Sequence, residues 1–441
     1  MLLRRWLMVF CFMCSLLVAG CGRETTAERA ANEYAAREIA AAPVHGNLTD
    51  YSLPPDKLAQ AQHLTSVYTA LHFTGLLWNI IQLILLLGLG VIAWMRDRAI
   101  AAGRRRWVQA YVFVFWFILA HMLLNLPLHI YGHHVALAYG FSVQRWMGWT
   151  ADLGKAVVLS WMLFGSLALL LFWLIGRLPK WWWLAFSVAV VPITFGLLYI
   201  NPIVVDPMFD RFEPLALHHP ELVAQLEHMG VPADRQFLMK ASAKVTTPNA
   251  YVTGLGSSKR IVVWDTSLDP KEGVSPGVLW MVGHECGHYV LNHVRNGTLM
   301  GLASLPLVLF LAFRFLQAMI ARFGGRWRIS SQHDWGAIAI LLLAYALINV
   351  VQEPISNTVS RQIEHNADIY GQEAIHGLVA DPQAAVKNEM DADGLRGLND
   401  PNPGRLIEFW TFNHPATGRR AAFGKAYDPW TQGMQPKYFP R

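Results

Sequence analysis

The sequence contains little charge and little cysteine for its length. Charged residues make up 15% of the 441 positions and hydrophobic residues 54%, whereas soluble domains average about 25% charged residues. This composition excludes a disordered chain, and four cysteines are too few for a small disulfide-stabilised fold. The net charge of +6 is weak evidence for any partner, and no nucleic-acid partner is expected. The balance favours a membrane protein with a sizeable water-facing part, because apolar side chains can face lipid as well as a protein core.

The first 20 residues have the pattern of a secretory signal peptide. Two arginines precede the apolar run 6–17, and small residues then lead to Cys21. A cysteine directly after Ala-Gly resembles the lipobox of bacterial lipoproteins, which implies cleavage before Cys21 and attachment of lipid to it. The alternative is a retained first transmembrane helix. After such processing Cys286 is the one unmodified cysteine of the sequence, so no intramolecular disulfide is expected.

Long apolar stretches account for the hydrophobic excess. Most of them are close to the ~20 residues that a helix needs to cross the hydrocarbon of a bilayer. The alternative, buried helices of a large soluble core, is weaker because the stretches lack a polar face. The expected transmembrane helices lie at 73–94, 107–128, 156–175, 181–200, 299–320 and 335–352.

Arginine and lysine residues flank alternate connections between these stretches, and cytoplasmic loops carry such an excess. The segments 201–298 and 353–441 are then expected on the other side of the membrane, which export of Cys21 predicts independently. We therefore expect a multi-pass protein of the bacterial inner membrane whose active site faces the periplasm. The flanking cations are Arg96, Arg98, Arg104, Arg105, Arg106, Arg177, Lys180, Arg322, Arg326 and Arg328.

The segment His284-Glu285-Cys286-Gly287-His288 carries the clearest chemical motif. On a helix, positions four apart lie on one face, so both imidazoles can bind one zinc ion. Glu285 can then reach a metal-bound water and act as general base. The alternative is a surface helix with two unrelated histidines.

A catalytic zinc site needs a third protein ligand, and Glu364 in the second extracytoplasmic segment can supply it. Asp368 follows four residues later on the same helical face and can orient a zinc-bound histidine through its free ring N–H. Arg361 precedes Glu364 by three residues and is expected to support this group from outside. The alternative is a solvated helix of alternating charge.

The two pieces together resemble the integral-membrane zinc metallopeptidases that include the CaaX prenyl endopeptidases and the bacterial HtpX-like proteases. The segment 248–254 is similar to the substrate-binding strand of that family, and 201–215 to the start of its catalytic domain. Asn413-His414-Pro415, with Arg420 six residues after the histidine, resembles its C-terminal motif. The similarity extends over about residues 55–430.

The resemblance implies a mainly α-helical, multi-span membrane protein with a zincin-like domain that carries a small β-sheet. It implies one Zn²⁺ bound by His284, His288 and Glu364, with Glu285 activating water. It further implies that Asn249 binds the substrate backbone. His414 and Arg420 would stabilise the oxyanion, which agrees with the need for donors where negative charge develops.

The expected function is that of a zinc metalloendopeptidase embedded in the membrane, with membrane-associated or misfolded envelope polypeptides as substrates. One alternative is a non-proteolytic lipoprotein that binds or chaperones such polypeptides, and another is a site-2 type protease with its zinc motif inside a span. The oligomeric state is left open. The expected parts are a signal peptide (1–20), an extracytoplasmic helical segment (22–71), four transmembrane helices (72–200), a catalytic region (201–298), two transmembrane helices (299–352) and a C-terminal catalytic region (353–441).

Overall fold

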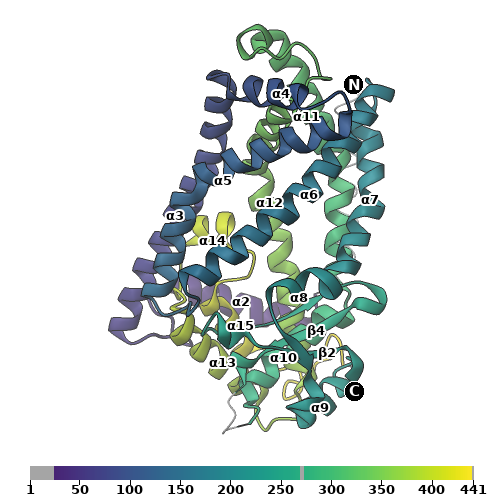
Figure 1. Ribbon diagram of the computed structural model, residues 1–441. Helices are drawn as coiled ribbons and strands as arrows, with labels where there is room; N and C mark the ends of the chain where they lie inside the picture. The colour runs from purple at the N-terminus through teal and green to yellow at the C-terminus, as the bar shows by residue number, and fades with distance from the viewer. Residues whose placement is uncertain (1–23, 269–272, 440–441) are drawn as a thin grey trace.

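The computed structural model describes residues 24–268 and 273–439. Long helices form one end of the molecule, and short helices with a small sheet form the other end (Figure 1). This arrangement confirms the expected fold class. The signal peptide at 1–20 and the lipidation site Cys21 lie outside the described residues.

Six helices in the described part of the chain are long and apolar enough to cross a membrane, as the sequence predicts. Their most hydrophobic windows are only 6% to 28% buried inside the protein. Buried helices of a soluble core would not leave most of such a surface uncovered, so the soluble-core alternative is wrong. The six are α3 (Pro55–Gly88), α5 (Arg106–Ala138), α6 (Trp146–Arg177), α7 (Trp182–Ile200) continued to Phe209 by the π-helical turn Asn201–Val205 and α8 (Asp206–Phe209), α11 (His293–Trp327) and α12 (Ala337–Ala374).

The first of these helices differs from its expected bounds of 73–94. Helix α3 runs without a break from Pro55, so residues 55–71 of the expected extracytoplasmic segment share one helix with the first span. It ends at Gly88, because Gly90 adopts a left-handed backbone with φ 76° that turns the chain into α4 (Val91–Ala101). Hydropathy alone detects only the part of such a helix that contacts hydrocarbon.

The basic connections gather at the end of the molecule opposite the sheet (Figure 1). Arg96 Nη1 donates to Asp334 Oδ2 at 2.8 Å, and Gln332 Nε2 donates to the carbonyl of Pro179 at 3.1 Å. These bonds join the three connections that the sequence predicts on one side of the membrane. At the other end, the connection between α5 and α6 lies against the catalytic part, since Val143 N donates to the carbonyl of Lys244 at 2.8 Å.

The sheet has four strands in the order β1-β2-β4-β3. β2 and β4 are parallel in the middle, and each edge strand is antiparallel to its neighbour. Ile261, Val262 and Val263 in the middle of β4 are apolar and fully buried, as a central strand requires. β3 is an edge strand, so its side away from β4 is unpaired in the described residues. It lies beside the helix that carries His284. The strands are β1 (Phe212–Pro214), β2 (Gln236–Met239), β3 (Ala250–Thr253) and β4 (Arg260–Trp264).

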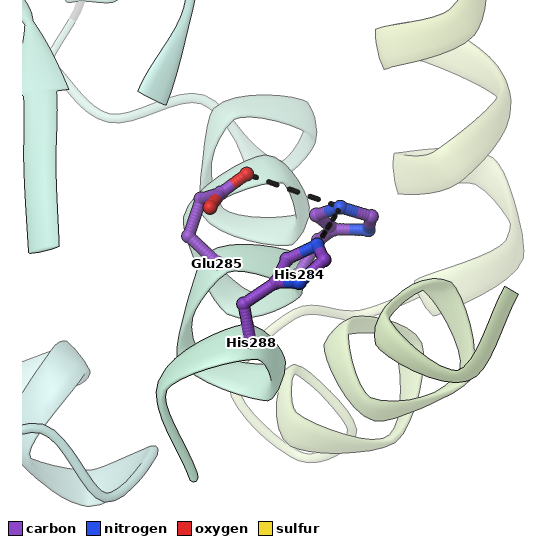
Figure 2. A group of neighbouring side chains, drawn as sticks. All are labelled: His284, Glu285 and His288. Carbon is purple, nitrogen blue, oxygen red and sulfur yellow. Dashed lines mark hydrogen bonds and ion pairs between the residues drawn. The ribbon is translucent and has the colours of Figure 1, made fainter. Parts of the chain in front are cut away.

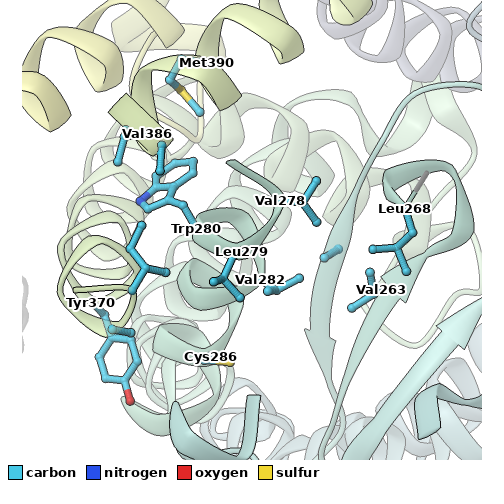
Figure 3. Close-up of a cluster of buried hydrophobic side chains, with 14 of the residues drawn as sticks. Val263, Leu268, Val278, Leu279, Trp280, Val282, Cys286, Tyr370, Val386 and Met390 are labelled. Atoms are coloured by element: carbon cyan, nitrogen blue, oxygen red, sulfur yellow. The ribbon is translucent and has the colours of Figure 1, made fainter. Parts of the chain in front are cut away.

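Short helices complete the catalytic part around one hydrophobic core. Figure 3 shows this core between the sheet, helix α10 and the neighbouring helices, with Val263, Val282 and Tyr370 among its members. Helix α10 is central to it. The helices are α2 (Thr26–Ala41), α9 (Pro220–His228), α10 (Pro276–Val290), α13 (Pro382–Gly397), α14 (Arg405–Thr411) and α15 (Thr417–Ala426).

Candidate active site

Helix α10 carries the zinc motif, and its sequence explains why it begins where it does. The hydroxyl of Ser275 accepts a hydrogen bond from Val278 N at 3.2 Å, and Pro276 occupies the first helical position. Nine of its fifteen residues are buried, so packing in the core stabilises the helix. With 15 residues, α10 is not one of the six candidate spans, which argues against a zinc motif inside a span.

Glycines bring α10 unusually close to the extension of α12. A Cβ atom on Gly371 would lie 2.7 Å from His284 N, and one on Gly287 would lie 2.9 Å from Tyr370 Cβ. Such contacts are too short for any side chain. The absence of side chains at these positions lets the two helices cross so that the histidines of α10 meet the carboxylates of α12.

Three side chains converge on one point. His284 Nε2 lies 3.0 Å from His288 Nε2, and each of these nitrogens lies 3.2 Å from Glu364 Oε2. Tetrahedral ligands at 2.0–2.1 Å from a zinc ion are about 3.3 Å apart, so the three atoms fit one ion with a fourth position open. Figure 2 shows the two imidazoles next to each other, with the carboxylate of Glu285 beside them. Ligand atoms of His284, Glu285 and His288 lie within 4.8 Å of one another, so Glu285 is close to the metal position.

Asp368 contacts the second ring nitrogen of His284, and Arg420 in turn binds Asp368. His284 Nδ1 lies 2.8 Å from Asp368 Oδ1, as expected from the sequence. Arg420 donates to the same carboxylate twice, from Nη2 at 2.7 Å and from Nε at 3.0 Å. A carboxylate on Nδ1 fixes the ring so that the Nε2 lone pair faces the metal position.

His293 is a partner of the site that the sequence interpretation missed. Its Nδ1 lies 3.0 Å from His288 Nδ1, so each zinc-facing histidine has a partner on its second nitrogen. Asn292 adopts a left-handed backbone between α10 and α11, with φ 57°, and this break folds His293 back onto His288. A histidine one helical turn after the motif, following an asparagine, is the signal that could have identified it.

Arg361 does not reach the zinc ligands. Its guanidinium donates to the carbonyls of Glu408 at 2.9 Å and Phe412 at 2.6 Å, and to the hydroxyl of Thr358 at 2.8 Å. It thus ties α12 to α14 and borders a second pocket of about 340 Å³ that His284, Glu285 and His288 do not line.

A pocket of about 120 Å³ opens beside the zinc motif. Glu285 lines it, and burial raises the pKa of this carboxyl above its ordinary value. His414 also lines it, and its Nε2 lies 3.1 Å from Glu364 Oε2. The structure thus brings together the residues that the sequence places far apart. The lining residues are Pro248, Asn249, Trp280, Met281, His284, Glu285, Glu389, Met390, Asp393, His414 and Arg420.

Both halves of the chain match families of known proteins. Residues 43–211 match the family described as CAAX prenyl protease N-terminal, five membrane helices, and residues 218–426 match peptidase family M48. The chain is 33% identical over 374 residues to the metalloprotease YhfN of Bacillus subtilis, a similarity that covers 83% of this chain and 85% of YhfN. It is 24% identical over 323 residues to CAAX prenyl protease 1 of Saccharomyces cerevisiae, covering 68% of each.

The fold also matches a solved structure. The crystal structure of S. mikatae Ste24p superposes with a TM-score of 0.70 over 95% of this chain and 98% of that chain, at 19% identity. The family resemblance expected from the motifs is therefore confirmed, and so is zinc as the cofactor. None of these similarities favours a non-proteolytic lipoprotein. The chain belongs to peptidase family M48 and is a multi-span membrane zinc metalloprotease.

Proposed function

We propose that His284, His288 and Glu364 bind the zinc ion of this protease. The observation that carries the proposal is the convergence of one atom from each residue, at 3.0 to 3.2 Å from one another. Asp368 holds His284 in the required tautomer, and Arg420 holds Asp368. Because both hydrogen bonds of Arg420 go to Asp368, we assign it to positioning this carboxylate, whereas the sequence predicts it beside the oxyanion.

In this proposal Glu285 transfers a proton, and His414 stabilises the negative charge that develops on the substrate. Zinc, when bound, supplies a Lewis acid that activates water and polarises the peptide carbonyl. Glu285 lines the pocket and takes the proton of the attacking water as general base. His414 borders the same pocket with a side chain that is 48% exposed, so its ring can donate to the oxygen that becomes negatively charged.

The free edge of β3 is the proposed binding place for the substrate backbone. An extended peptide can add to such an edge through main-chain hydrogen bonds. Asn249 precedes β3 directly, is exposed and lines the pocket, while its carbonyl is held by Trp264 N at 3.0 Å. Its backbone is therefore fixed. Its side-chain oxygen accepts a hydrogen bond from Ala250 N at 2.8 Å, so the amide NH₂ is the group that we propose donates to a bound peptide.

We also propose membrane-associated or misfolded polypeptides of the bacterial envelope as substrates. The basic connections lie at the end opposite the catalytic part (Figure 1), which supports a periplasmic active site in the inner membrane. Prenylated CaaX proteins are made in the eukaryotic cytosol and would not meet such a site. We also propose that the chain is divided into the membrane and catalytic regions expected from the sequence, that it is cleaved before Cys21, and that Cys21 is lipidated.

Replacement of the general base tests this function. Glu285→Gln in the purified full-length protein should lower cleavage of an extended peptide by at least about 100-fold. Its zinc content should stay that of the parent, because Glu285 is not a ligand. Glu33→Gln, which neutralises an exposed glutamate on α2, is the matched control and should cleave normally. Undiminished cleavage by Glu285→Gln would rule out the proposed chemistry.

A further inference from the structure

One wall of the active-site pocket comes from helix α13, which the proposed mechanism does not use. Glu389, Met390 and Asp393 of this helix line the pocket together with Trp280 of α10. Glu389 and Asp393 are four residues apart, so they lie on one face of the helix. Figure 3 shows Met390 beside Trp280, where α13 packs against α10.

Glu389 is a buried carboxylate without a partner. The residue is 6% exposed, and its side chain makes no hydrogen bond or ion pair with any residue in the described part of the chain. A Cβ atom on Gly277 would lie 2.7 Å from Glu389 Oε2, so a glycine in the first turn of α10 leaves the space for this carboxylate. Asp393 accepts one hydrogen bond, from Asn399 Nδ2 at 2.8 Å.

Arg420, a cation that lines the pocket, already has a hydrogen-bond partner. Arg420 forms its two short hydrogen bonds with Asp368 and makes none with α13 in the described residues; at longer range Arg420 and Arg396 attract both α13 carboxylates, but burial outweighs this attraction. Burial raises the pKa of Glu389 to about 7, with a further contribution from Asp393, and burial also raises the pKa of Asp393. A buried carboxylate without a partner is costly, and a cation supplied by a ligand removes that cost.

We propose that Glu389 and Asp393 form a subsite that binds a cationic side chain, lysine or arginine, next to the scissile bond of the substrate. Trp280 and Met390 supply apolar surface for the methylene groups of such a side chain, and the carboxylates receive its charged end. The subsite rests on the proposed function, since it selects among peptides that the zinc site cleaves.

Matched peptides test the subsite with the purified full-length protein. The peptides share one sequence and differ only in the residues that flank the scissile bond, which are lysine, norleucine or glutamate. The parent protein should cleave the lysine peptide with a kcat/KM about tenfold or more above the norleucine peptide, as expected for a hydrogen-bonded charge pair. Glu389→Gln with Asp393→Asn should abolish this preference while cleavage of the norleucine peptide is retained.

Asp391→Asn is the control on the same helix. Asp391 pairs with Lys387 and does not line the pocket, so its replacement should leave the preference unchanged. Equal cleavage of the lysine and norleucine peptides by the parent, or an unchanged preference in the double variant, would overturn the subsite.

A binding measurement separates this proposal from the proposed function. In the Glu285→Gln background, fluorescent forms of the same peptides should bind with the lysine peptide about tenfold tighter, and the α13 replacements should remove the difference. Selective binding without cleavage by the parent would contradict the hydrolytic mechanism alone. Equal binding of the two peptides would contradict the subsite alone.

Discussion

At the scale of single residues, each of the two histidines that we propose as zinc ligands is held by a partner outside the metal site. His284 is held by Asp368 at 2.8 Å and His288 by His293 at 3.0 Å. These partners decide which ring nitrogen carries the proton, and therefore which nitrogen is free to bind a metal. Arg420 extends the first pair by a further step, since it holds Asp368 through both oxygens.

Asp368→Asn should weaken zinc binding by about 10- to 100-fold, because the negative charge that orients His284 is lost. The measurement is a competition titration of zinc against a chelator, monitored on the purified protein. Asp391→Asn, an acidic-to-amide change at a residue that does not line the pocket, should leave the zinc affinity unchanged. A normal affinity in Asp368→Asn would mean that this carboxylate does not position the ligand.

At the scale of elements, the site exists because α10 and the lower part of α12 cross at glycines. Gly371 meets His284 N so closely that no side chain fits between the helices. Glu364 and Asp368 lie four residues apart on α12, so a single crossing places one carboxylate at the metal position and the other behind His284.

Gly371→Ala should push the helices apart, lower the zinc content and lower the unfolding free energy by roughly 1–3 kcal/mol. Gly75→Ala is the control, since a Cβ there meets nothing within 4 Å, and it should have no such effect. Zinc content and thermal unfolding of both variants check the prediction. Full zinc occupancy with unchanged stability in Gly371→Ala would show that the close crossing is unnecessary.

The sequence predicts which residues of α10 and α12 form the site. It does not predict the residues of α13 beside them, because their burial depends on tertiary packing. The spacing of His284 and His288, and of Glu364 and Asp368, is local, so helical geometry predicts each pair. Glu389 and Asp393 could not be predicted, because an acidic pair at this spacing usually faces solvent. Their burial depends on how α13 packs against α10, a helix that ends 92 positions before α13 begins.

At the scale of the whole molecule, the basic connections between spans and the zinc motif lie at opposite ends. The three basic connections are joined at one end, for example by the hydrogen bond of Arg96 to Asp334, and the zinc motif lies at the other (Figure 1). The six candidate spans of the described residues run between these two ends, so a bilayer around them would separate the ends. Hydropathy predicts the number of spans, but it cannot predict that α3 continues beyond the hydrocarbon as one helix.

The proposed orientation predicts the accessibility of engineered cysteines. A cysteine at Asn388, exposed on α13, should react with a membrane-impermeant thiol reagent added from the periplasmic side. A cysteine at Ala102, exposed in a basic connection, should react only after the membrane is opened. Cys286 is buried, and the parent protein provides the background signal. The reverse labelling pattern would place the active site in the cytoplasm.

The most direct test of the proposed centre is the zinc content of the purified protein and of one ligand variant. The parent should contain one zinc ion per chain, and Glu364→Gln should lose most of it, because a neutral amide is a much poorer zinc ligand than a carboxylate. Glu285→Gln, purified in parallel, should keep its zinc. Absence of zinc from the parent, or full zinc content in Glu364→Gln, would contradict a centre formed by His284, His288 and Glu364.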